Sequence, residues 1–183
     1  PSGWFRQNQI RLAAFYLQQC VPVVDLEKRE VSPAVARKAQ ANLDEATAHP
    51  TPYNALQNVF YLPVRKWLFD KNASADKFAR AQASVDLARV GIALERFKLA
   101  HSAYPESLDV LAPQFIQKLP HDVIGGQPLK YRRTNDSFVL YSIGWNERDD
   151  GGVIAYYQSN SRDEMSLITD PENGDWVWSY PTK

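Results

Sequence analysis

Residues 76–105, DKFARAQASVDLARVGIALERFKLAHSAYP, decide the fold of this chain. The stretch contains one Gly and no Pro before its last residue, which favours an uninterrupted helix. At about 100° per residue its apolar side chains form two opposed sets. One set is Phe78, Val85, Ala88, Ile92 and Leu99, and the other is Leu87, Val90, Leu94 and Phe97. We predict a helix from about Asp76 to Ala103 that is covered on two sides, by a sheet on one face and by residues 1–75 on the other.

The pattern after this helix changes from a helical to a strand period. Tyr104-Pro105 ends the helix, because a residue before Pro disfavours the helical conformation, and a short helix follows with Leu108, Leu111 and Phe115 inside. Beyond Pro120 the sequence predicts strands at residues 129–133, 138–143, 153–157 and 176–180. The fold class is therefore α+β, with the long helix packed on an antiparallel sheet of three or four strands.

Residues 1–75 carry helical patterns of their own. Apolar residues recur at helical spacing between Trp4 and Cys20, and Ser32-Pro33 is a start signal with Ser as the N-cap. A second apolar stretch, Tyr53 to Phe69, precedes a linker at residues 70–74. We predict a helical region at 1–75 that packs on the long helix, followed by an α+β domain at 76–183.

Composition excludes several classes of protein. The chain has 183 residues, 44% of them hydrophobic, and a formal net charge of zero. A net charge of zero argues against a nucleic-acid binder, which needs clustered basic charge. A single Cys excludes an intrachain disulfide and a Cys-based zinc site, and the three His residues show no metal-ligand spacing. No apolar run reaches the ~18 residues that span a membrane, so we expect any anchor to lie upstream of Pro1.

Several short motifs follow the long helix in a characteristic order. They are Tyr104-Pro105, then Leu119-Pro120-His121-Asp122, Gly126-Gln127-Pro128, Tyr141-Ser142-Ile143-Gly144, and Asp149-Asp150-Gly151-Gly152. This order resembles the soluble part of the major pseudopilin of type II secretion, general secretion pathway protein G, and the C-terminal region of larger bacterial proteins that carry the same block. The resemblance implies a non-enzymatic, periplasmic or otherwise extracytoplasmic domain with protein partners in the cell envelope.

Two of the positions that depart from the pseudopilin pattern have another residue in place of glycine. Ser102 stands where the Gly of the Gly-x-Tyr-Pro signature is expected, and Glu147 stands where the loop after Tyr141 has Gly. The preceding helical region also differs from a pseudopilin, in which an apolar N-terminal helix leads directly into the domain and packs in a filament. We therefore expect the fold and not the filament.

The loop after Ser142 is the candidate metal site. In the resembling pseudopilins this loop binds calcium, which takes six to eight oxygen ligands. Here Asn146, Asp149 and Asp150 would supply some of them, and Asp175 is a further candidate. Asn146 replaces an Asp of the pattern and removes one charge. The alternative is an acidic turn closed by its own hydrogen bonds.

Other functions remain open from the sequence. The late aromatic residues could line a carbohydrate- or peptide-binding face, with Trp176 and Trp178 on one side of a strand, or could be buried against the long helix. No nucleophile elbow, phosphate-binding loop or zinc-protease motif is present, so no catalytic residue is predicted. A pocket that placed His101 or His121 beside a carboxylate would instead indicate an enzyme. Asp122 is expected to accept backbone hydrogen bonds within its own loop.

Overall fold

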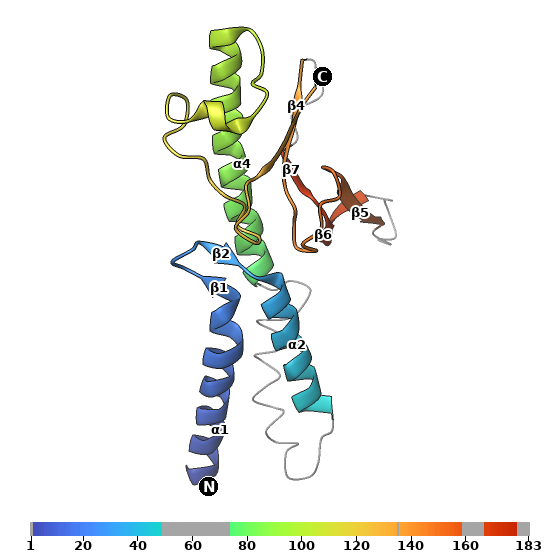
Figure 1. The fold of residues 1–183 in the computed structure, drawn as a ribbon. Coiled ribbons are helices and arrows are strands. Elements are labelled where there is room, and N and C mark those ends of the chain that lie inside the picture. The colour runs from blue at the N-terminus through green and yellow to red at the C-terminus, as the bar shows by residue number, and fades with distance from the viewer. Residues whose placement is uncertain (1, 49–73, 135, 159–166, 179–183) are drawn as a thin grey trace. The chain divides into compact units, whose positions relative to one another are not determined.

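The computed structural model describes residues 2–48, 74–134, 136–158 and 167–178 (Figure 1). The chain divides into two compact units, Pro1–Phe78 and Ala79–Lys183. The helix expected at Tyr53–Phe69 lies outside the described residues. The packing of residues 1–75 on the long helix concerns both units and stays a prediction.

The first unit consists of two helices and a small hairpin between them. Helix α1 (Ser2–Phe15) continues as a π-helix, η1 (Tyr16–Cys20), and a 3₁₀ turn, η2 (Val21–Val23). Strands β1 (Val24–Asp25) and β2 (Glu30–Val31) pair antiparallel, and α2 (Pro33–Ala48) follows. The hairpin was not predicted, because its strands are too short to show a period.

The start of α2 confirms the N-cap prediction. The backbone N–H of Val35 donates to Ser32 Oγ at 3.3 Å, and Pro33 occupies the first helical position. Leu43 and Ala39 on this helix are fully buried. The amide of Asn42 donates to Gln19 Oε1 at 2.8 Å, which ties α2 to η1.

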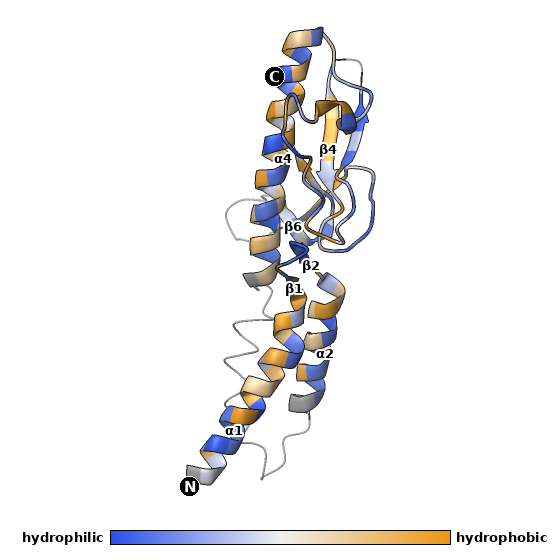
Figure 2. Ribbon diagram, turned by 60° about the vertical axis from the view of Figure 1, so that its left-hand side comes forward, coloured by the Kyte–Doolittle hydropathy of each residue, from blue (hydrophilic) through white to orange (hydrophobic). Residues whose placement is uncertain are grey.

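The second unit is organised around the long helix, α4 (Ser74–His101). Leu87, Val90 and Leu94 are each at most 3% exposed, and they form the core with Leu140, Phe138 and Leu129. Hydrophobic and hydrophilic residues alternate in bands along α4 (Figure 2). The Leu87–Val90–Leu94 set is therefore the inner face of α4, which packs in the core; the sequence had not indicated which of the two apolar faces the sheet would cover. Fully burying each of these side chains contributes roughly 1.5–3 kcal/mol.

The inner face of α4 packs on a three-stranded antiparallel sheet. Its strands are β3 (Lys130–Arg133), β4 (Phe138–Ser142) and β7 (Trp176–Trp178), in the order β3-β4-β7. Tyr131 lies opposite Leu140, and Leu140 lies opposite Trp178. Trp178 also reaches α4, since a Cβ added to Gly91 would lie 3.1 Å from its indole ring. The α+β class is thus observed, with mixed helices and small antiparallel sheets.

Two sequence predictions need correction here. Strand β5 (Ile154–Gln158) does not join the main sheet but pairs with β6 (Leu167–Gly174) in a separate two-stranded sheet. Strand β6 was not predicted, because Asp170-Pro171-Glu172-Asn173 has the composition of a turn. The short helix after Pro105 is a single 3₁₀ turn, η3 (Leu108–Leu111), whose Leu111 is fully buried.

Candidate functional site: the loop after strand β4

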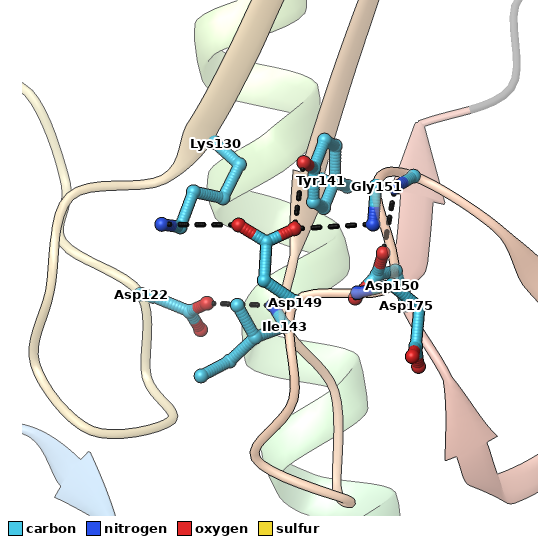
Figure 3. Close-up of polar contacts among 9 residues, drawn as sticks. Asp122, Lys130, Tyr141, Ile143, Asp149, Asp150, Gly151 and Asp175 are labelled. Atoms are coloured by element: carbon cyan, nitrogen blue, oxygen red, sulfur yellow. Dashed lines mark hydrogen bonds and ion pairs between the residues drawn. The ribbon is translucent and has the colours of Figure 1, made fainter.

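The start of the loop after β4 is held by Asp122, a carboxylate that is only 2% exposed. Its Oδ1 accepts hydrogen bonds from Ser142 Oγ at 2.7 Å and from the Ile124 N–H at 3.0 Å. Its Oδ2 accepts the Ile143 N–H at 3.0 Å (Figure 3). Burial raises the pKa of Asp122, although these hydrogen bonds and the charge of His121 oppose the rise. The expected role of Asp122 inside its loop is confirmed, and it extends to the end of β4.

The end of the same loop is held by a second buried carboxylate, Asp175. Its Oδ2 accepts the Gly152 N–H at 2.6 Å, and its Oδ1 accepts the Asp150 N–H at 3.3 Å. Burial raises the pKa of Asp175, while the bond from Gly152 acts in the opposite direction. Asp122 and Asp175 therefore fix the two ends of the loop 143–152.

Between these two anchors, Asp149 makes polar contacts with two strands, β3 and β4, and with its own loop. Tyr141 Oη donates to its Oδ1 at 2.9 Å, the Gly151 N–H donates to the same oxygen at 3.1 Å, and Lys130 Nζ lies 3.2 Å from Oδ2 (Figure 3). The hydrogen bond from Tyr141 is the main cause that lowers the pKa of Asp149. Burial, followed by the bond to Asp149, raises the pKa of Tyr141 to about 12.

The other two candidate metal ligands bond to each other. Asn146 Nδ2 donates to Asp150 Oδ2 at 2.8 Å, and Asn146 Oδ1 accepts the Arg148 N–H at 3.0 Å. The amide thus turns its nitrogen, which cannot bind a cation, toward Asp150. The Lys130 ammonium already lies against Asp149, where a cation would be expected. This arrangement favours the turn closed by hydrogen bonds, and the calcium site stays a prediction.

Within the described ranges, no group of three or more His, Cys, Asp or Glu side chains could hold a metal ion. His101 stacks on Phe97 with ring centroids 4.1 Å apart, and it is exposed at the end of α4. His121 forms a bridge with Pro128. The charge of His121 acts on the carboxyl of Asp122, which accepts hydrogen bonds from its own loop.

Two glycines make the loop possible. Gly144 has a φ of +70°, and a Cβ there would lie 2.4 Å from the carbonyl oxygen of Gly174. Gly174 has a φ of +72°, and a Cβ there would lie 2.5 Å from the Ala155 backbone nitrogen. Both positions exclude any side chain, because the obstacle is backbone. The backbone of the loop at Gly144 therefore lies directly against the backbone at Gly174, the last residue of β6.

Among the late aromatic residues whose side chains the structure describes, burial differs from one to the next. Trp176 is 6% exposed, and Trp178 is half-buried against the core. Tyr156 is 53% exposed. Trp178 thus packs on the long helix, as one of the two sequence alternatives has it, and Trp176 is buried as well.

The outer face of α4 carries exposed apolar side chains at seven-residue spacing. Val85 is 55% exposed, Ile92 60% and Leu99 86%, and Phe78 continues the spacing toward the start of the helix at 74%. This is the first of the two apolar sets in the sequence.

None of the described helices is both long and apolar enough to cross a membrane. Comparison with protein-family models, with curated proteins and with solved structures found no match to this chain.

Proposed function

We propose that this chain is a non-enzymatic module of pseudopilin-like fold that works in the cell envelope by binding other proteins. The observation that carries the proposal is the exposed apolar row on α4. Single exposed apolar residues are ordinary, but a row on one face of a helix is typical of an interaction surface. The polar residues that the sequence offered for chemistry instead hold the protein's own loops, as the contacts of Asp122, Asp149 and Asp175 indicate.

The backbone supports the pseudopilin-like part of the proposal at two positions. Ser102 has a φ of +61° and Glu147 a φ of +58°, both in the left-handed region that favours glycine. At both positions the resembling family has glycine. If these two turns have the geometry of the pseudopilin signatures, the chain is expected to keep the left-handed backbone conformation even where another residue has replaced glycine.

Photo-crosslinking in the cells that make the protein tests this function. A photoreactive amino acid is placed in turn at exposed positions of the second unit, including Ile92 on α4 and Val110 on η3. Adducts with other proteins at one or more positions are expected, together with protease sensitivity of the domain once the outer barrier of the cell is opened. If no position gives an adduct, or if the domain is protected inside the cytoplasm, the proposed function is wrong.

A further inference from the structure

The outer face of α4 has a definite chemistry besides its apolar row. At about 100° per residue, Arg89 and Arg96 lie about 40–60° to one side of the neighbouring members of the Val85–Ile92–Leu99 row. Arg89 is 50% exposed and pairs with Asp86 at 3.0 Å, while Arg96 is exposed and donates to the Phe115 carbonyl at 3.1 Å. Because a guanidinium carries five N–H donors, one such bond leaves capacity for a partner.

Of the acidic residues of α4, Asp86 pairs with Arg89 and offsets part of its charge. Asp86 is 6% exposed, and its second oxygen accepts Gln82 Nε2 at 2.8 Å. Glu95 is half-buried and accepts the Tyr104 hydroxyl at 2.5 Å. The face is therefore a narrow apolar row with cationic groups along one side. Ala88 lies beside the row, and its small side chain lets another helix approach closely.

We propose that this face binds an acidic amphipathic helix of another protein. A row of residues seven apart drifts slowly around a straight helix, and a second helix that supercoils with it can follow the row. The spacing of Val85, Ile92 and Leu99 therefore fits a helical partner. Acidic residues beside the partner's apolar seam would pair with Arg89 and Arg96. The inference rests on the proposed function and names its partner class.

Three other occupants fit this face of α4 less well than an acidic helix. A second copy of this chain would bring arginines against arginines. Residues 1–73 contain nine Lys and Arg against six Asp and Glu, so they do not supply the acidic complement. A lipid surface would need a wide apolar face with aromatic anchors, whereas the outer row is one residue wide and Phe78 is its single aromatic member.

The direct test measures binding of two synthetic helices to the full chain. Both peptides have about four heptads with apolar a positions, and they carry either Glu or Lys at the flanking positions. We expect the acidic peptide to bind at least about tenfold more tightly than the basic one, and the preference to weaken with salt. Ile92→Asp should remove the binding, and Arg89→Glu with Arg96→Glu should reverse the preference. Val110→Asp, an equally exposed apolar site on η3, should change neither.

Several results would overturn the inference. Equal binding of the two peptides, no binding of either, or a preference that survives the double arginine reversal would each exclude an acidic helix. Ile92-dependent dimerisation in sedimentation equilibrium would assign the face to a second copy, and Ile92-dependent sedimentation with phosphatidylglycerol vesicles would assign it to a membrane. A large loss of melting temperature in Ile92→Asp alone would assign it to residues 1–75. Crosslinks at Val110 but none at Ile92 would leave the proposed function standing without this partner.

Discussion

Ser102 adopts a left-handed backbone conformation directly after the last residue of α4. A residue with a Cβ pays roughly 1 kcal/mol in this region, whereas Gly adopts it readily. We expect Ser102→Gly to raise the free energy of unfolding by about 0.5–1 kcal/mol, after the larger entropy of Gly in the unfolded chain is subtracted. Urea unfolding measures the change. Ser84→Gly, an exposed site in the middle of the same helix, should instead lower stability by a similar amount; a loss at both sites would contradict the account of the helix end.

The Tyr141–Asp149 pair predicts an alkaline transition. The pKa of Tyr141 is about 12 in the folded protein against about 10 in an unfolded chain. A raised pKa means that the stabilisation is complete below about pH 10 and is lost as the pH rises through 12. Tyrosinate absorbance should show a late step that is absent in Tyr141→Phe. Asp149→Asn should move this step to lower pH, because it removes the charge that opposes tyrosinate; a Tyr141 step at the ordinary value would contradict the pair.

Calcium gives a further test at the scale of single residues. If Asn146, Asp149 and Asp150 bind the ion, stability should rise with free calcium, by about 2.7 kcal/mol at a hundredfold excess over Kd. Asp150→Ala should remove most of that gain, since it deletes a hard oxygen ligand, and Asp136→Ala, in the turn between β3 and β4, should not. Identical melting curves in calcium and in chelator would leave the turn that is closed by the Asn146–Asp150 hydrogen bond.

Among the helices and strands, the contact between α4 and β7 gives the sharpest test of the packing. A Cβ at Gly91 would lie 3.1 Å from the indole of Trp178, so the helix approaches the sheet through this residue. Gly91→Leu should destabilise the protein by about 1–3 kcal/mol through overpacking, despite the better helix propensity of Leu. Trp fluorescence and urea unfolding measure the effect together. An unchanged stability would show that β7 does not pack on α4 at this point.

The elements themselves were largely predictable from local pattern. Helix α4 extends over 28 residues, close to the bounds set by the linker before it and by Tyr104-Pro105 after it. The strands β3, β4, β5 and β7 also lie where the period of two placed them. Their pairing was not predictable, because register and sheet membership depend on contacts distant in sequence. The β5–β6 sheet is the clearest case, since a strand containing Pro171 has no strand signal of its own.

The loop after β4 was predictable only in part. Its acidic composition and its glycines marked it as a candidate site. The anchoring by Asp122 and Asp175 required the structure, since their partners lie 21 and 23 residues away along the chain. The link from Tyr141 and Lys130 to Asp149 has no local signal either. Sequence therefore located the loop, and the long-range hydrogen bonds determine what its carboxylates do.

At the scale of the whole molecule, the account depends on the two opposite faces of α4. The inner face holds the core through Leu94, which is fully buried, while Ile92 on the outer face is 60% exposed. An aspartate buried at position 94 without a partner should cost several kcal/mol and unfold the second unit. An aspartate at position 92 meets solvent and should leave stability within about 0.5 kcal/mol of the unmodified protein.

Thermal unfolding of the full chain with either Leu94→Asp or Ile92→Asp tests the central claim most directly. The account predicts that Leu94→Asp abolishes the cooperative transition of the second unit. It also predicts that Ile92→Asp melts as the unmodified protein does while losing the acidic helix. A matching loss of melting temperature in Ile92→Asp would contradict the proposed binding face and would support instead the sequence-based prediction that residues 1–75 cover this side of α4.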